Sequence, residues 1–329
     1  MNRPQLLRDL PKVDLHSHIA GTISVENLHR LAKKAGITIP DNVYAVESAM
    51  DFLAKLDVVA SVLIEPEDFE LITYEYLSSG ARTSNLRHAE IFWNATLYPT
   101  QLFSDILAAI RSGAAAAESE FGISTLILPA ICREQGPEVA DQLLDLVLAH
   151  LGPDIAGIGL DGDELAAPPE LFVDVFQRAG RAGLKRTAHV TYPPASRVQY
   201  CIDVLGCDRI DHGYYVLEDA LESQAVADRQ VPVTVCYSLT CLSRGWDLQT
   251  HPLKAMHDMG FNLILGTDDE AFVDTNIGNE YVRVCDGYEL PMAEVTKLLH
   301  AGVTASWADD ARKAELHAEI DQAVSAIPA

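Results

Sequence analysis

The chain has 329 residues, of which 48 % are hydrophobic and 22 % are charged, so a large buried core is expected and general disorder is excluded. With 48 acidic against 24 basic side chains, the formal net charge is −24 at pH 7. Such an acidic surface repels phosphate backbones and anionic lipid, so we expect neither nucleic acid nor a membrane as a partner.

Cysteine usage and the first residues favour a cytoplasmic protein. The six cysteines are scattered and none forms a CxxC pair, which argues against a secreted disulfide framework and favours free, mostly buried thiols. Residues 1–12 contain no apolar segment of the kind that a secretion signal needs. The longest apolar run, near Ile123–Cys132, is too short to span a bilayer.

Short apolar runs alternate with amphipathic stretches along the chain. Several of the runs are rich in Val, Ile and Leu, which is typical of parallel strands covered on both faces. The predicted strands are Lys12–His16, Leu86–Trp93, Ser124–Ile131, Ile155–Asp161, Lys185–Val190, Arg209–His212, Val231–Cys236 and Asn262–Thr267.

Helical patterns lie between these runs, and several have a recognisable start or stop. Of the four predicted helices, the first follows a serine that can act as its N-cap, and the second begins after a proline with two acids in its first turn. The fourth lies between a proline pair and a glycine. The predicted helices are Val25–Lys34 after Ser24, Glu67–Ser79 after Pro66, Glu138–His150, and Glu170–Ala182 between Pro169 and Gly183.

Eight strands interleaved with helices predict a (β/α)8 TIM-type barrel that occupies residues 1–329 as a single domain. A doubly wound open sheet is the alternative arrangement of the same units. The stretch between the first two predicted strands is longer than one crossover helix. We therefore expect a helical insertion there, near the mouth of the barrel.

Metal-capable side chains gather at the carboxyl ends of the predicted strands, where barrel enzymes place their active sites. His16 and His18 end the first strand, His189 the fifth, His212 the sixth, and 268–269, an aspartate pair, the eighth. Because strand side chains alternate, the His-x-His spacing puts two imidazoles on one face. This clustering is hard to reconcile with ordinary surface or core histidines.

The donor set predicts a zinc site. His16, His18, His189 and Asp268 supply the mixed nitrogen and oxygen ligands that suit Zn²⁺ better than Fe²⁺, Co²⁺ or Mn²⁺. Adjacent acids after a strand often cap a helix or stay solvated, so Asp269 needs a separate explanation. Its side chain should diverge from that of Asp268, which suits one metal ligand and one substrate-binding group.

Motifs across nearly the full length resemble the adenosine deaminase family of the amidohydrolase superfamily. Residues 11–21 (PKVDLHSHIAG) resemble the family's opening metal motif, and residues 52–57 and 74–77 with 89–91 resemble its early helices and second strand. Residues 160–164 (LDGDE) resemble the segment with a substrate-contacting glycine, and 209–213 (RIDHG) resemble the catalytic histidine motif. Residues 251–253 with 266–269 (GTDD) resemble the final acid-pair motif.

The resemblance implies one Zn²⁺ per chain, held with a water molecule by the four ligands named above, and a lowered pKa for that water. It implies that His212 orients or deprotonates the water. Asp269 would form a hydrogen bond with purine N7, and the backbone N–H of Gly162 would meet ring nitrogen N3. The substrate would be a small amino-heterocycle.

Two positions depart from the family pattern. The family's third motif reads His-Ala-Gly-Glu, and its glutamate protonates ring nitrogen N1. Here the segment reads His189-Val-Thr-Tyr192, so Tyr192 either donates a hydrogen bond through its phenol or only fills space. Ala20 stands where the family places an aspartate that binds the ribose 5′ hydroxyl, so a free base, a modified nucleoside or a different heterocycle becomes a more plausible substrate.

Three functions remain open from the sequence. The first is zinc-dependent hydrolytic deamination of an adenine-like nucleoside, base or related amino-heterocycle. The second is metal-dependent hydrolysis of a different C–N or related bond that needs no ring protonation. The third is a catalytically inactive relative that binds a purine. The complete metal set favours the first two, and no feature of the sequence indicates an oligomeric state.

Overall fold

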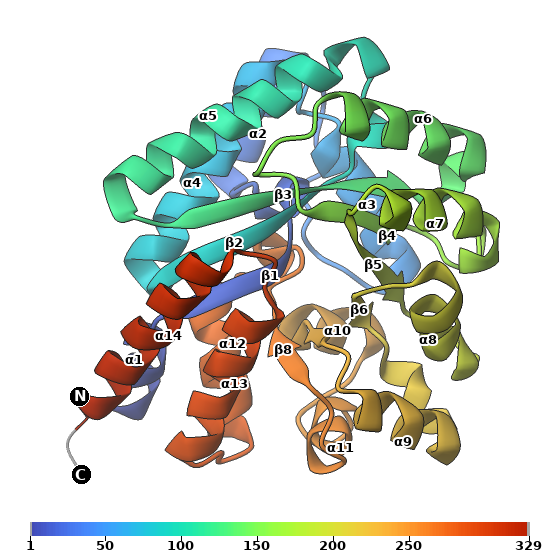
Figure 1. Cartoon of the computed structure of the whole chain (residues 1–329). Helices are drawn as coiled ribbons and strands as arrows, with labels where there is room; N and C mark the ends of the chain where they lie inside the picture. The colour runs from blue at the N-terminus through green and yellow to red at the C-terminus, as the bar shows by residue number, and fades with distance from the viewer. Residues whose placement is uncertain (1, 328–329) are drawn as a thin grey trace.

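A computed structural model describes residues 2–327 and contains eight parallel strands arranged in a barrel (Figure 1). All seven neighbouring pairs, from β1–β2 to β7–β8, run parallel. The strands are β1 (Lys12–His18), β2 (Leu86–Trp93), β3 (Ser124–Cys132), β4 (Gly157–Asp161), β5 (Lys185–Val190), β6 (Arg209–His212), β7 (Val233–Val235) and β8 (Leu263–Leu265).

The sheet closes because the segment after β8 returns to β1. The Asp268 N–H donates to the His16 carbonyl at 2.8 Å, and the His18 N–H donates to the Asp268 carbonyl at 3.0 Å. Ser17 and Asp268 form the corresponding parallel bridge. This closure confirms the predicted (β/α)8 barrel and excludes the open sheet. It also brings the ends of β1 and β8 together.

Helices follow the strands around the outside of the barrel (Figure 1). No helix within residues 2–327 is long and apolar enough to cross a membrane. The α-helices are α1 (Arg3–Asp9), α2 (Val25–Ala35), α3 (Ala49–Ala60), α4 (Pro66–Ser84), α5 (Phe103–Phe121), α6 (Gly136–Ala149), α7 (Val173–Arg181), α8 (Ser196–Tyr200), α9 (Ala220–Arg229), α10 (Tyr237–Arg244), α11 (Leu253–Asp258), α12 (Ile277–Gly287), α13 (Met292–Ala305) and α14 (Asp310–Ser325).

The predicted insertion between β1 and β2 is present and contains α2 and α3 ahead of α4. Ser24 caps α2 as expected, because its hydroxyl accepts the Asn27 N–H at 3.3 Å. The predicted helix 170–182 is divided, since a 3-10 turn over Pro169–Phe172 precedes α7. Strands β7 and β8 are each three residues shorter than predicted, because the chain leaves the ladder to enter the site region.

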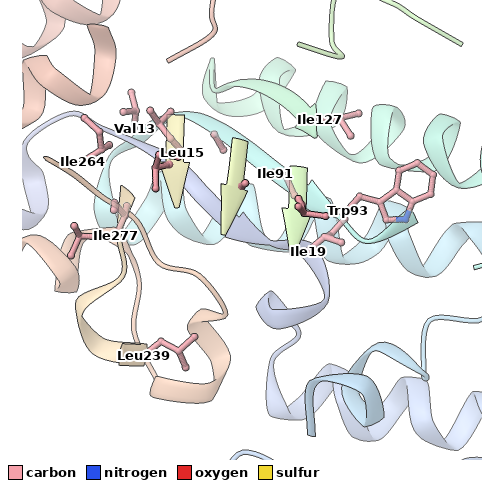
Figure 2. Packing of buried hydrophobic residues seen from close by; sticks show 14 of the residues in the cluster. Val13, Leu15, Ile19, Ile91, Trp93, Ile127, Leu239, Ile264 and Ile277 are labelled. Carbon is pink, nitrogen blue, oxygen red and sulfur yellow. The ribbon is translucent and has the colours of Figure 1, made fainter. Parts of the chain in front are cut away.

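Apolar side chains fill the space between strands and helices. Figure 2 shows this packing, in which Val13 and Leu15 of β1 lie near Ile264 of β8. Residues of the insertion and of later helices join the same cluster, including Ile19 and Leu239. Since this core surrounds the barrel, the carboxyl ends of the strands are rigid supports for polar side chains.

The barrel interior also contains a buried ion pair between opposite strands. Arg209 of β6 donates to Glu90 of β2 at 2.7 Å, and both side chains are fully buried. The Arg209 guanidinium lies 4.2 Å from the ring centroid of Trp307, and the backbone N–H of Trp307 donates to Glu90. The ion pair, the backbone hydrogen bond and the aromatic ring therefore offset part of the cost of burying these two charged groups.

Candidate active site

Four predicted metal ligands converge at the carboxyl end of the barrel. His16, His18, His189 and Asp268 are buried, and each offers a ligand atom within 4.8 Å of the others. The Nε2 atoms of His18 and His189 are 3.1 Å apart. An Asp268 carboxylate oxygen lies 3.5 Å from Nε2 of His16 and 3.4 Å from Nε2 of His18. This spacing is short enough for all four residues to bind one ion.

Hydrogen bonds fix which nitrogen of His16 faces the cluster. The Thr234 hydroxyl donates its one hydrogen to Asp211 at 2.8 Å, so it must accept from Nδ1 of His16, also at 2.8 Å. The other nitrogen, Nε2 of His16, is buried and has no hydrogen-bond partner in the described part of the chain, so its lone pair faces the cluster. Asp211 also lies 3.5 Å from Nδ1 of His189. Asp211 therefore supports two of the four donors from behind.

The electrostatics keep several of these imidazoles neutral, as metal ligands must be. Burial lowers the pKa of His18 to about 4 and lowers the pKa of His189 well below its ordinary value. Burial opposes ionisation of Asp268, but the neighbouring histidines, chiefly His16, outweigh it and lower the pKa of Asp268. His16 differs: burial lowers its pKa, but the charges of Asp268 and Asp211 outweigh burial and raise it. Three buried imidazoles around an ionised carboxylate fit a divalent ion such as zinc, which would take the place of a proton on His16.

His212 lies beside this donor set. Its Nε2 is 3.5 Å from the second carboxylate oxygen of Asp268, and burial lowers its pKa to about 4. His212 and Asp268 both have left-handed backbone angles, with φ of 68° and 61°. Such angles are uncommon outside glycine and concentrate at functional sites. The turns after β6 and β8 thus hold these two side chains together at a conformational cost.

Asp269 points into the same pocket, and its position depends on a glycine. A Cβ atom on Gly21 would lie 1.9 Å from Oδ1 of Asp269, so a larger residue at position 21 would displace the carboxyl group. Oδ1 of Asp269 is buried and has no protein partner within residues 2–327. Burial, followed by the charge of Asp268, raises the pKa of Asp269. The carboxyl group is therefore available to a ligand.

The pocket extends from the metal ligands to the ends of β3 and β4. Gly162 lines it with φ of +88°, a conformation that favours glycine. Asp161, just before it, accepts a hydrogen bond from Asn94 at 2.8 Å, and its Oδ1 is buried without a partner in the described chain. Glu134, in the turn after β3, also lines the pocket.

The loop after β5 holds Tyr192 at the pocket wall. The buried Glu164 carboxylate accepts the N–H groups of Thr191 at 2.6 Å and Tyr192 at 3.1 Å. Arg197 forms an ion pair with Glu164 at 3.0 Å. Arg244 lies 4.5 Å from the Tyr192 ring centroid and donates to the Thr191 carbonyl. Glu164 is thus an anchor for the loop, and Tyr192 is the residue that lines the pocket.

One wall of the pocket is apolar. Ala20 lines it and is buried, so no polar side chain occupies the position expected to bind a sugar hydroxyl. Helix α3 of the insertion adds Phe52, Leu53 and Leu56 to the same wall. The apolar wall and the metal-ligand cluster belong to one pocket, which suits a flat heterocycle with little polar substituent.

The structure thus brings the predicted site residues together and adds others that the sequence did not single out. All of them line one pocket or support its lining. The predicted residues that line the pocket are His18, His189, Asp268, His212, Asp269, Gly162 and Tyr192, and His16 lies directly behind them. The additional lining residues are Glu134, Asp161, Asn94 and Arg244. Asp211 and Thr234 lie behind the histidines and were also not predicted.

Comparisons with known proteins agree with this geometry. A family model described as adenosine deaminase matches residues 11–323. The adenine deaminase of Psychrobacter cryohalolentis is 31 % identical over 97 % of this chain and 99 % of its own length. That of Cupriavidus taiwanensis is 33 % identical over 98 % of this chain and 94 % of its own.

Two solved structures share the architecture over nearly the whole chain. The crystal structure of adenine deaminase from Arthrobacter aurescens has a TM-score of 0.90 and 33 % identity, covering 96 % of this chain and all of that one. An amidohydrolase from Burkholderia ambifaria with bound zinc has a TM-score of 0.88 and 29 % identity, covering 99 % of this chain and 95 % of that one.

Proposed function

Because the chain belongs to the adenosine deaminase family, we propose that it is a zinc-dependent hydrolase that releases ammonia from adenine or a closely related amino-heterocycle. The observation that carries this proposal is the convergence of His16, His18, His189 and Asp268 in the pocket described above. Relatives that share about a third of their residues with this chain are adenine deaminases, and one neighbouring structure holds zinc.

We infer that these four residues hold one zinc ion per chain. When bound, the ion supplies Lewis acidity that makes water a competent nucleophile near neutral pH. The chain's own part is to present three imidazoles and one carboxylate in a fixed arrangement. Asp211 and Thr234 orient His16 for this purpose through the hydrogen bonds already described.

The remaining residues act on the substrate and the proton. His212, neutral at physiological pH and next to Asp268, is placed to accept a proton from the attacking water. Asp269 offers Oδ1, which has no partner within residues 2–327, to ring nitrogen N7, and Gly162 offers its backbone N–H to ring nitrogen N3. Tyr192 supplies a phenol where the family has a carboxylic acid, and we assign it as the hydrogen-bond donor to the ring.

The proposal also covers the setting of the enzyme. Residues 1–329 would form a single hydrolase domain that acts on a small molecule in the cytoplasm. All six cysteines are free thiols and four of them are buried, which agrees with a reducing compartment. No nucleic-acid or membrane partner is proposed, given the net charge of −24.

The test is ammonia release by zinc-reconstituted protein supplied with adenine, adenosine and modified adenine nucleosides. We expect turnover of at least one aminopurine, with formation of the corresponding oxo compound. The Asp268→Asn variant, which loses the ligand carboxylate, should be inactive. The absence of ammonia from every aminopurine in the panel would rule the proposal out.

A second candidate rests on one observation, the phenol of Tyr192 in place of a carboxylic acid. A metal-dependent hydrolase that cleaves a different C–N or related bond would not need a strong ring acid. Cleavage of amides, esters or substituted purines in a substrate screen, without turnover of simple aminopurines, would favour this candidate over deamination. Nucleoside binding with no turnover of any substrate would favour an inactive relative.

A further inference from the structure

Glu134 is one of three pocket carboxylates with no part in the proposed chemistry, together with Asp57 and Asp161. It lies in the 3-10 turn Arg133–Gln135, directly after β3, and its side chain is exposed at the pocket. The position was absent from the sequence-based site, because a single glutamate after a strand is usually a solvated turn residue. The structure instead places its carboxylate against the backbone of Gly162.

The contacts of Glu134 define where its carboxylate points. Oε1 accepts the backbone N–H of Asp163 at 2.5 Å, and Oε2 accepts the thiol of Cys132 at 3.1 Å. A Cβ atom built on Gly162 would lie 2.2 Å from Oε2. A ligand atom placed over Gly162 therefore also meets Glu134. Each carboxylate oxygen keeps lone-pair capacity for a further donor.

The charges around Glu134 make a negative mouth to the pocket. Asp57 of α3 also lines it, and burial followed by the charge of Glu134 raises the pKa of Asp57. Among the described lining residues, Arg244 is the one arginine or lysine, and it is already engaged with the Thr191 carbonyl and the ring of Tyr192. A phosphate at this mouth would be repelled, whereas an N–H donor would be attracted.

We propose that Glu134 determines specificity for a free heterocyclic base, by accepting a hydrogen bond from the ring N–H beside the ring nitrogen that faces Gly162. In adenine these neighbouring positions are N9–H and N3. A nucleoside has no N9–H, because its sugar occupies that position. The buried Ala20 offers no polar partner for such a sugar. This inference rests on the proposed deaminase function and names the substrate class of that same site.

The test combines a residue change with a substrate change. Glu134→Gln keeps an acceptor for the Asp163 N–H and removes the charge, whereas Glu134→Ala removes the acceptor. Each variant is assayed with adenine, 9-methyladenine and adenosine, after its zinc content and folding have been checked. Glu138→Gln is the matched control, since Glu138 is an exposed carboxylate of α6 that does not line the pocket.

The wild type should prefer adenine to 9-methyladenine and adenosine in kcat/KM. A charge-assisted hydrogen bond corresponds to about 10–100-fold, so we expect losses with adenine of about tenfold for Glu134→Gln and about a hundredfold for Glu134→Ala. These losses should fall mainly on KM, because the contact exists in the ground state as well. With 9-methyladenine both variants should stay within about threefold of the wild type.

Two kinetic results would overturn the assignment. One is an equal loss with adenine and 9-methyladenine, which would separate Glu134 from the N–H position. The other is a wild type that prefers adenosine and loses this preference in Glu134→Ala, which would assign the carboxylate to sugar hydroxyls. The Glu138→Gln control should match the wild type throughout.

Calorimetric binding of hypoxanthine, inosine and 9-methylhypoxanthine separates this inference from the deaminase proposal. If no aminopurine is turned over but hypoxanthine binds more tightly than the other two, and Glu134→Ala removes the difference, the specificity role stands while the deaminase proposal fails. Equal binding of the three ligands to the wild type would reject the role of Glu134, whatever the turnover.

Discussion

At the scale of single residues, Asp211 shows how the ligands are oriented without itself joining the metal-ligand set. It accepts hydrogen bonds from Thr234 at 2.8 Å and Thr187 at 2.7 Å, and it lies behind His16 and His189. Its carboxylate is fully buried. The side chain therefore fixes the tautomer of His16 through Thr234 and favours the orientation of His189.

Asp211→Asn should weaken zinc binding by about 10–100-fold while leaving the barrel folded. The reason is that an amide at this position can donate to Thr234, which would reverse the hydrogen bond that orients His16. Competition with a zinc chelator of known affinity measures the change. Asp203→Asn, at an exposed carboxylate paired with Arg229, is the control and should leave affinity unchanged. Unaltered affinity in Asp211→Asn would remove its positioning role.

Tyr192→Phe tests the phenol as a donor to the substrate ring. The ring of Tyr192 is held by Arg244 and its backbone by Glu164, so the variant should keep the wall of the pocket intact. Loss of a donor in the transition state should lower kcat by about 10–100-fold with little change in KM. Steady-state kinetics at matched zinc content measure both. Equal kcat in variant and wild type would assign Tyr192 to pocket shape alone.

Sequence reasoning at this scale could predict the ligands and missed their supports. The spacing of His16 and His18 follows from strand alternation, and ends of parallel strands meet at one rim of the barrel. The role of Asp211 depends on Thr234, a residue of the neighbouring strand β7. A contact between two strands leaves no regular spacing in the sequence, so it could not be predicted. Glu134 was missed for a similar reason, because its contact with Gly162 joins two different turns.

At the scale of elements, the loop after β5 owes its shape to one buried carboxylate. Glu164 accepts both backbone N–H groups of Thr191 and Tyr192 and pairs with Arg197. This arrangement ties the turn after β4 to the turn after β5. The sequence contains Glu164 only as the last residue of the motif 160–164 and indicates no anchoring role for it, since its partners belong to a different βα unit.

Glu164→Gln should lower both stability and turnover, because an amide cannot satisfy two backbone donors and an arginine as a carboxylate does. We expect about 1.5–3 kcal/mol less free energy of unfolding, typical for hydrogen bonds to a charged group. We also expect kcat/KM to fall, since Tyr192 loses its tether. Urea denaturation and steady-state kinetics measure these effects. Glu170→Gln, at an exposed position in the 3-10 turn before α7, should change neither; full activity in Glu164→Gln would contradict the anchoring role.

Element boundaries show where sequence patterns are sufficient. Strands β2, β5 and β6 were predicted with their observed bounds, because apolar runs and flanking polar residues coincide there. Strands β7 and β8 were predicted too long at both ends, since the ladder covers only three inner residues of each predicted run. The positive φ of Asp268 redirects the chain just beyond β8, and hydrophobicity carries no signal for such a turn.

At the scale of the whole molecule, the ion pair between Glu90 and Arg209 joins opposite sides of the barrel. Burial alone would raise the pKa of Glu90, but the charge of Arg209 outweighs it and lowers the pKa. A carboxyl group with a lowered folded-state pKa contributes stability above its unfolded pKa, and loses that contribution as the pH falls through the folded value. The barrel is therefore expected to lose stability in acid partly through this pair.

Glu90→Gln leaves Arg209 buried with only the more distant Asp211 carboxylate, 3.9 Å away, as a charged partner, so it should reduce the free energy of unfolding by about 3–5 kcal/mol at pH 7. The difference from the wild type should shrink as the pH falls below about 4, where the wild-type carboxylate also begins to lose its charge. Urea denaturation at several pH values measures this trend. Glu319→Gln, which breaks a half-buried pair with Arg87, should cost less than about 1 kcal/mol. A constant difference across the pH range would contradict this role for Glu90.

The overall architecture was the most predictable level, because eight apolar runs separated by helices admit few arrangements. The insertion between β1 and β2 was predictable from length alone. Its role was not, since the contribution of α3 to the pocket wall depends on how the insertion folds back over the barrel mouth.

The most direct test of the account is a zinc titration of metal-free protein, with ammonia release from adenine as the readout. We expect no turnover without metal, a linear rise on addition of zinc, and a plateau at one equivalent per chain. The variant His18→Ala should show no such rise, because it lacks a ligand. Full turnover by metal-free protein, or an undiminished rise in His18→Ala, would contradict the assignment of this cluster as the catalytic zinc site.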